Sequence, residues 1–140
     1  MQHIIRPVVA AGLASAILVN LTIAAYAETS ATPPSVLIFD QKPQDGQITV
    51  EYAYLPSNGY VVLYGADKNG QPVHEPLGHI ELKAGDHRKI GIKLNNATQN
   101  GKTMWAALYV DKDSKPGFDK TADASIWNDE LPLENRFVVR

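Results

Sequence analysis

Apolar and polar residues alternate along most of the chain from residue 36 onward. This period of two is typical of half-buried β-strands, and clusters of Gly, Pro, Asn and Asp separate the runs as turns would. No run after residue 35 has the longer period of an extended amphipathic helix. The pattern predicts strands at residues 36–40, 47–55, 60–66, 77–83, 87–94, 104–111 and 136–140, with a short strand or turn at 125–128.

About seven short strands without helices between them predict an all-β fold, a single antiparallel two-sheet sandwich of the immunoglobulin-like type. The alternation in the second segment predicts one core-facing set of side chains, made of Ile48, Val50, Tyr52 and Tyr54. The segments 60–66 and 104–111 are apolar on both faces, as in inner strands.

The segments 77–83 and 87–94 are expected to pair as a hairpin. Paired residue numbers must have an even sum if the apolar positions of both segments are to face one core. A three-residue loop containing Gly satisfies this condition and places Glu81 opposite Lys89, a favourable pair of unlike charges.

Residues 1–27 have the parts of a secretory signal peptide, with one Arg near the start, an apolar run at 8–24 and a small-x-small cleavage site. We expect a flexible leader at 28–35 and a single β-sandwich domain at 36–140. An uncleaved membrane anchor is the alternative, because the apolar run approaches the roughly 20 residues that cross a bilayer. The expected location is periplasmic or extracellular, and only an uncleaved signal segment would touch a membrane.

Composition narrows the classes of function. The chain has no Cys and a formal net charge of −2. Because no basic cluster is present, neither nucleic acid nor an anionic membrane is an expected partner. The lack of Cys excludes disulfides, a thiolate nucleophile, a Cys-ligated zinc site and a blue-copper centre. No Ser, His or Asp lies in a nucleophile elbow or another local catalytic setting, so no catalytic residue is predicted.

Four motifs follow one another in a distinctive order. They are Gly59-Tyr60-Val61-Val62-Leu63-Tyr64, Leu77-Gly78-His79, Leu82-Lys83-Ala84-Gly85-Asp86-His87, and Trp105-Ala106-Ala107-Leu108-Tyr109-Val110-Asp111 with Gly117-Phe118-Asp119. In this order the chain resembles an uncharacterised domain family, a domain of unknown function found in exported archaeal and bacterial cell-envelope proteins. The resemblance covers about residues 39–140 and implies a β-sandwich outside the cytoplasm, with no established activity to carry over. The chain departs from the family pattern at Lys112 and Lys115.

The loop at 111–123 is the best candidate for chemistry. Alternating carboxylates followed by Gly and another Asp can supply oxygen ligands to Ca²⁺, which takes six to eight of them. The predicted calcium ligands are Asp111, Asp113, Asp119 and Asp123. Lys115 stands where a further oxygen donor would be expected, and no Glu ends the loop, so a solvated charged turn is the alternative interpretation.

Three histidines, His74, His79 and His87, lie beyond the signal segment. In the predicted hairpin, His79 and His87 lie about 13 Å apart at about 3.3 Å per residue, too far to share one ion. A two-ligand copper or zinc site that includes His74 stays open, as does the alternative that all three are surface residues.

Large aromatic side chains could form a stacking platform for sugars or peptides. The candidates are Tyr52, Tyr54, Tyr60, Tyr64, Trp105, Tyr109 and Trp127. Their alternation favours core packing for most of them. Trp127 is the exception, since it lies in a loop-like stretch where exposure is expected.

The function best supported by the sequence is an exported, non-catalytic binding or structural module, whose partner is an unknown protein or small ligand at the cell envelope. The alternative is a periplasmic metal-binding protein, using calcium at the acidic loop or copper or zinc at the histidines. A third hypothesis is an enzyme whose residues converge only in the folded chain.

Overall fold

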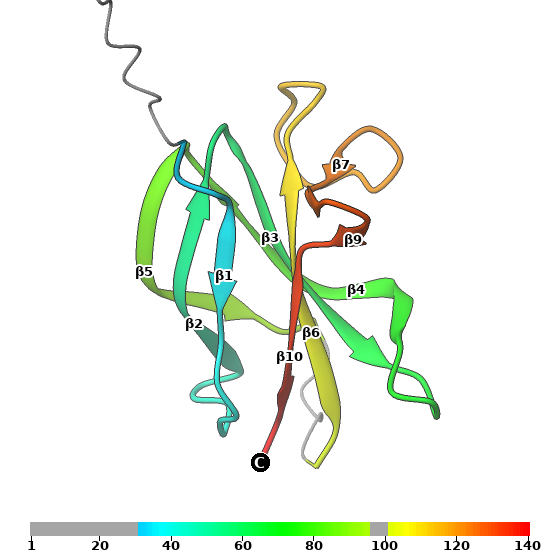
Figure 1. The fold of residues 1–140 in the computed structure, drawn as a ribbon. Coiled ribbons are helices and arrows are strands. Elements are labelled where there is room, and N and C mark those ends of the chain that lie inside the picture. Colours follow the sequence, from blue (N-terminus) through cyan, green and yellow to red (C-terminus); the bar gives the residue numbers. More distant parts are fainter. Residues whose placement is uncertain (1–30, 96–100) are drawn as a thin grey trace, which may run out of the picture. The chain divides into compact units, whose positions relative to one another are not determined.

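The computed structural model of the chain describes residues 31–95 and 101–140, which form an all-β unit (Figure 1). Its strands are β1 (Ser35–Leu37), β2 (Gln47–Leu55), β3 (Gly59–Ala66), β4 (Pro72–Leu82), β5 (Gly85–Lys93), β6 (Thr103–Val110), β7 (Ala124–Ser125), β8 (Trp127–Asn128), β9 (Leu131–Pro132) and β10 (Glu134–Val138). The described residues contain no helix. Thus none of them belongs to a helix that could cross a membrane.

The strands form two principal antiparallel sheets. The three-stranded sheet has the order β1-β2-β5, and the larger sheet has the order β10-β6-β3-β4, with the short β7 paired to β6. The hairpin of β8 and β9 forms a small separate sheet. The prediction of an all-β sandwich is confirmed. Strands β1 to β6 and β10 correspond to the seven predicted segments. The predicted signal peptide and residues 28–30 of the predicted leader lie outside the described residues.

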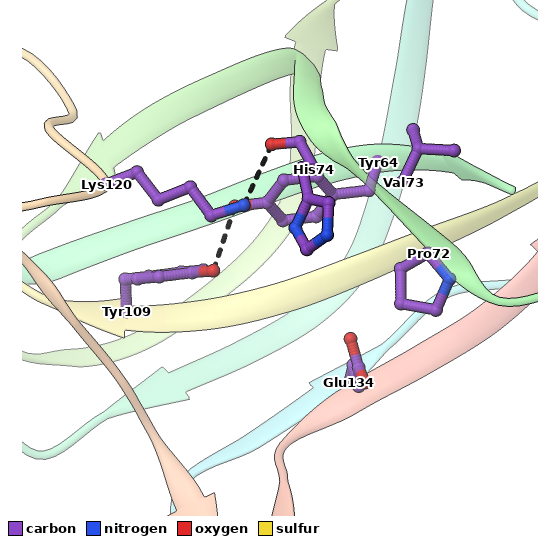
Figure 2. A pocket seen from close by; sticks show the side chains of 7 residues that line it. All are labelled: Tyr64, Pro72, Val73, His74, Tyr109, Lys120 and Glu134. Carbon is purple, nitrogen blue, oxygen red and sulfur yellow. Dashed lines mark hydrogen bonds between the residues drawn. The ribbon is translucent and has the colours of Figure 1, made fainter.

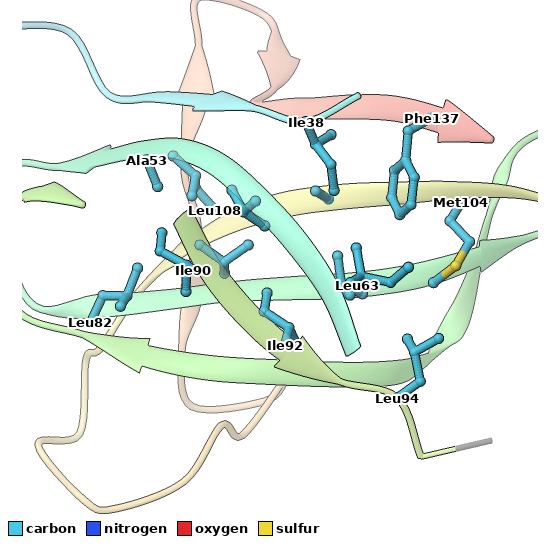
Figure 3. Packing of buried hydrophobic residues seen from close by; sticks show 14 of the residues in the cluster. Ile38, Ala53, Leu63, Leu82, Ile90, Ile92, Leu94, Met104, Leu108 and Phe137 are labelled. Atoms are coloured by element: carbon cyan, nitrogen blue, oxygen red, sulfur yellow. The ribbon is translucent and has the colours of Figure 1, made fainter. Parts of the chain in front are cut away.

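The core lies between the two principal sheets (Figure 3). Ile48 on β2 and Ile92 on β5 reach it from one side, and Leu63 on β3 and Leu108 on β6 reach it from the other. Phe137 on β10 closes it at the edge and is almost fully buried. Each such side chain stabilises the fold by about 1.5–3 kcal/mol when it leaves water, so this layer is the main source of stability.

The predicted hairpin of residues 77–83 and 87–94 was wrong. β4 pairs with β3, and β5 pairs with β2, so the two segments belong to different sheets. Leu82 and Ile90 nevertheless enter the same core, from opposite layers. The chain changes sheets at Lys83 and Ala84, where the backbone N–H of Ala84 donates to the Asn58 side chain at 3.0 Å. A sandwich needs this crossing because both of its layers must cover the core.

The face prediction for β2 was right at one end and wrong at the other. Ile48 and Val50 point into the core, whereas Tyr52 and Tyr54 are only partly buried and Ala53 is buried in their place. The core-facing residues of β2 therefore have even numbers up to Val50 and odd numbers after it.

The change of parity coincides with an irregularity in β5. Lys89 has a φ of 53°, a left-handed conformation that is uncommon for a residue with a side chain. Its ammonium forms an ion pair with Glu51 on β2. Next to it, the Arg88 guanidinium lies 5.1 Å from the centre of the Tyr52 ring. Both pairs occupy the outer surface, which explains why Tyr52 does not enter the core.

A seam joins the beginning of the sandwich to its last strand. The backbone N–H of Gln41 donates to the carbonyl of Val138 at 3.1 Å, and that of Arg140 donates to the carbonyl of Gln41 at 2.8 Å. The Asp40 carboxylate accepts from the backbone N–H of Val138 at 2.8 Å. These hydrogen bonds hold β10 beside the segment that follows β1, as Figure 1 shows.

Candidate functional site

The outer face of the larger sheet carries a second apolar cluster, remote from the main core. Its buried members are Tyr60, Val62, Tyr64, Ala107 and Tyr109, with Trp105 and Phe118 packed against them. Most of these side chains come from β3 and β6, whose other faces supply the main core. The outer face of an antiparallel sheet in a sandwich is often exposed to solvent. Buried aromatic side chains on this face must therefore be covered by another part of the chain.

The acidic loop at 111–123 provides part of that cover. The Tyr60 hydroxyl donates to the carbonyl oxygen of Gly117 at 3.0 Å. The Phe118 ring lies 4.8 Å from the Tyr109 ring in an edge-on arrangement and 5.6 Å from the Tyr60 ring. Such aromatic pairs contribute about 0.5–1.5 kcal/mol beyond their burial. The loop is therefore packed onto the sheet and is more than a solvated turn.

A cavity of about 160 Å³ opens beside this cluster, and we call it the outer pocket (Figure 2). It is lined by Tyr64, Pro72, Val73, His74, Tyr109, Lys120 and Glu134. These residues come from β3, β4, β6, β10 and the acidic loop, so the pocket exists only in the folded sheet. In Figure 2, Tyr64, Tyr109 and Lys120 lie on one side, and Pro72 and Glu134 lie on the other.

Polar groups gather at this pocket. The hydroxyls of Tyr64 and Tyr109 form a buried hydrogen bond at 2.8 Å. The Lys120 ammonium donates to the backbone carbonyl of His74 at 2.8 Å and lies 5.3 Å from the centre of the Tyr64 ring. A cation over an aromatic face is attracted by the ring electrons, so Lys120 is held at the pocket by two contacts.

Burial changes the acid–base properties of these groups. Desolvation, aided by the hydrogen bond with Tyr109, raises the pKa of Tyr64 far above its usual range. Desolvation also raises the pKa of the Glu134 carboxyl. Burial raises the pKa of Tyr60, outside the pocket, to about 12. Tyr64 therefore stays a neutral phenol at neutral pH, able to donate or accept a hydrogen bond but unsuited to act as a base.

The predicted calcium ligands divide into a group of three and one outlier. Asp111, Asp113 and Asp123 each place a carboxylate oxygen within 4.8 Å of the others. Asp119 does not belong to this group. Its carboxylate accepts from the hydroxyl and the backbone N–H of Thr121, and these hydrogen bonds lower its pKa.

The three grouped carboxylates also shape the loop itself. Asp123 is buried and accepts from the backbone N–H groups of Lys112 at 3.1 Å and Asp119 at 2.8 Å. Asp111 accepts from Ser114, and Asp113 accepts from Lys115, both at 2.9 Å. The oxygen-rich group suits a hard cation such as Ca²⁺, and its hydrogen bonds independently explain why the loop is folded. Calcium binding stays a prediction.

The histidines lie in three different surroundings. His74 lines the outer pocket. The centre of the His79 ring lies 5.9 Å from that of Phe118. The His87 ring forms a 2.7 Å hydrogen bond with the carbonyl oxygen of Lys83, where the chain changes sheets. Within residues 31–95 and 101–140, no group of three or more possible metal ligands contains a histidine.

The aromatic residues follow the sequence expectation in outline. Trp127 is 56% exposed on the β8–β9 hairpin, as predicted. Trp105 is partly buried and donates from its indole N–H to the carbonyl of Gly70 at 3.0 Å. Tyr60, Tyr64 and Tyr109 are buried, yet on the outer face of the sheet. Tyr64 and Tyr109 also line the outer pocket.

Sequence reasoning missed Lys120 and Glu134 as site residues. Glu134 lies in a segment without a recognisable motif, and Lys120 lies in the acidic loop, where the carboxylates drew attention as metal ligands. The double-faced apolar pattern of the two inner strands is one sequence signal that points to this region. That pattern predicts a covered outer face without revealing which residues cover it.

Two packed antiparallel sheets with a covered outer face define the class of this protein as a β-sandwich. The chain belongs to the family described as a domain of unknown function (DUF7282), which matches residues 34–137. No curated protein and no solved structure matches the chain. The family resemblance seen in the sequence is confirmed, and its description assigns no activity.

Proposed function

We propose that this protein is a non-catalytic binding module that works in the periplasm or outside the cell. The observation that carries the proposal is the outer pocket, where the Tyr64–Tyr109 hydroxyl pair, Lys120 and Glu134 surround one cavity. A small concave site with a few convergent polar groups is the usual form of a ligand site.

The state of Tyr64 and Lys120 supports binding over catalysis. The raised pKa of Tyr64 keeps its hydroxyl protonated, and Lys120 is engaged by a carbonyl and a ring. Nucleophiles and general bases need a lone pair that is free at the working pH. Fixed donors and acceptors instead suit the recognition of a ligand.

The proposed location depends on residues 1–27, whose pattern is that of a signal peptide. Cell fractionation followed by N-terminal sequencing of the protein tests it. Cleavage after Ala27 is the expected result. A protein that retains Met1 in the membrane fraction would support the anchor, and recovery from the cytoplasm would contradict export.

The binding proposal is tested with ¹⁵N NMR spectra of the purified protein during titration with a library of small polar compounds. We expect at least one compound to shift the amide signals of Tyr64, His74, Tyr109 and Lys120. If no compound shifts them, the outer pocket is not a ligand site. Turnover of ester, glycan or peptide substrates would overturn the non-catalytic assignment.

Calcium binding by the acidic loop is a second candidate function, favoured by the approach of the Asp111, Asp113 and Asp123 oxygens to within 4.8 Å of one another. Calorimetric titration of CaCl₂ into the protein is the test, with Asp113→Asn expected to abolish the heat of binding. Asp119→Asn is the matched control, because Asp119 lies outside the group. Heat that Asp119→Asn removes and Asp113→Asn leaves, or no heat at all, would contradict this candidate. ZnCl₂ and CuCl₂ titrations test the histidine alternative.

A further inference from the structure

We propose that the outer pocket binds one neutral sugar ring, a single pyranose unit such as the end of a glycan chain. This inference rests on the proposed function and adds the chemical class of the ligand. It follows from the size of the cavity, its hydrogen-bonding groups and the balance of its charges.

The size of the pocket suits one six-membered ring. A closed protein cavity of about 150 Å³ accommodates benzene, and the outer pocket measures about 160 Å³. A disaccharide or a peptide of several residues would extend beyond it. Since the pocket opens to solvent, a ring bound there could still be attached to a longer chain outside.

The polar groups supply donors and acceptors together. Within the Tyr64–Tyr109 pair, one hydroxyl proton is shared between the two oxygens, and the other remains available to a ligand. Lys120 uses one of its three N–H groups on the His74 carbonyl, which leaves two. An ionised Glu134 offers only acceptors. A ligand must therefore both accept and donate, and sugar hydroxyls do both at every position.

The charges of the pocket favour a neutral ligand. Its lining contains one Lys, Lys120, and one carboxyl residue, Glu134, and their charges are opposite. An anion attracted by Lys120 would meet the Glu134 carboxylate, and a cation attracted by Glu134 would meet the Lys120 ammonium. A polyhydroxylated ring engages both groups without adding a charge to a partly desolvated site.

Two apolar residues favour a ring over a short zwitterion. Pro72 and Val73 line the pocket on β4 and offer carbon surface against which the C–H groups of a pyranose can pack. An amino acid such as alanine could pair with Lys120 and Glu134, but it would leave most of this surface uncovered. The hydroxylated ring uses both the charged and the apolar parts of the lining.

The test uses ¹⁵N NMR titrations of the purified protein with defined probes. The sugars are methyl α-D-glucopyranoside, methyl α-D-mannopyranoside and methyl β-D-galactopyranoside. L-alanine represents a zwitterion, acetate an anion, methylammonium a cation and benzyl alcohol an apolar ring. We expect at least one sugar to shift the signals of Tyr64, His74, Tyr109 and Lys120, and the other probes to shift them at least tenfold less at equal concentration.

Two variants, each with a matched control, test whether the sugar binds in the outer pocket. Glu134→Gln removes the charged acceptor and keeps the shape, and it is expected to weaken sugar binding about tenfold. Glu130→Gln, an exposed carboxyl in the β8–β9 turn, is the matched control and should leave the affinity unchanged. Tyr109→Phe should also weaken binding, while Tyr54→Phe on the other sheet should not. Melting curves of each variant confirm that the fold is retained.

The possible outcomes separate this inference from the proposed function. Sugar binding that Glu134→Gln and Tyr109→Phe both weaken supports the inference. Sugar binding that neither variant changes overturns it, because the ring then lies elsewhere. If alanine, acetate, methylammonium or benzyl alcohol shifts the pocket signals and no sugar does, the inference fails and the binding module stands. If none of these probes and no compound of the wider library shifts them, both fail.

Discussion

The hydroxyl groups of Tyr64 and Tyr109 lie 2.8 Å apart in the outer face of the larger sheet, although 45 positions separate them in the chain. Tyr64 comes from β3 and Tyr109 from β6, the two neighbouring inner strands. Both rings are buried, so each hydroxyl depends on the other for much of its hydrogen bonding. This dependence can be measured directly.

Tyr64→Phe is expected to lower the free energy of unfolding by about 1–3 kcal/mol, because it leaves the buried Tyr109 hydroxyl without its partner. The double variant Tyr64→Phe/Tyr109→Phe should lose less than the sum of the two single losses, since no orphaned hydroxyl remains. Urea unfolding of the four proteins measures this. Strictly additive losses would show that the two hydroxyls do not stabilise one another.

Gly59→Ala is expected to destabilise the fold by about 1–3 kcal/mol. A methyl group at Gly59 would lie 2.0 Å from the carbonyl oxygen of Tyr109, a backbone atom that cannot move aside. Gly65→Ala on the same strand is the matched control, because its nearest contact is 3.3 Å from the mobile end of the Leu77 side chain. Thermal unfolding compares the two variants, and equal losses would contradict the predicted clash.

Asp123→Ala is expected to loosen the acidic loop and to cost about 2 kcal/mol or more, because two backbone N–H groups lose a buried charged acceptor. Asp113→Ala, which removes a single such hydrogen bond from a partly exposed position, should cost less. Hydrogen exchange at Lys112 and Asp119 is the informative measurement. Unchanged protection in Asp123→Ala would show that the carboxylate does not hold these amides.

Glu134→Gln is expected to stabilise the protein relative to the wild type increasingly as the pH rises from 4 to 7. Burial raises the pKa of Glu134 above its ordinary value of 4.5, so the folded state favours the protonated carboxyl. In the wild-type protein, the protonated Glu134 carboxyl stabilises the fold below its unfolded pKa. This stabilisation is lost as the pH rises through the folded pKa. Melting temperatures of both proteins across this range test it, with Glu130→Gln as control. A difference that does not change with pH would contradict the predicted shift.

The strands could be predicted because the direction of each side chain is a local property of the chain. The period of two in residues 47–50 and the double apolar faces of 60–66 and 104–111 identify half-buried strands and inner strands without knowledge of their partners. The change of parity after Val50 could not be predicted, because it coincides with the left-handed backbone of Lys89 on another strand.

The sequence pattern did not determine which strands pair with each other. Ile90 and Ile92 satisfy the even-sum condition with Ile80 and Leu82, and they satisfy it equally with Val50 and Ile48, the partners in the structure. Register rules restrict how two strands align, but they do not state which two strands align. The error in the 77–94 hairpin arose from this ambiguity.

The candidate sites could be predicted only where their residues are close in sequence. The acidic loop could be predicted for this reason, and the structure brings the carboxylates of Asp111, Asp113 and Asp123 together. The outer pocket was not visible, because it joins one residue of the loop to residues of four strands. Asp119 lies outside the group of three carboxylates, since its carboxylate accepts a local hydrogen bond from the Thr121 hydroxyl.

The seam between Asp40 and the last strand affects how the protein can be made. Arg140 lies 100 positions after Asp40, and their side chains meet at 3.4 Å. The sandwich therefore cannot close until both segments have been synthesised, and contacts between such distant residues slow the folding of β proteins. A newly synthesised chain stays open during this delay, with the apolar side chains of its core still in contact with water.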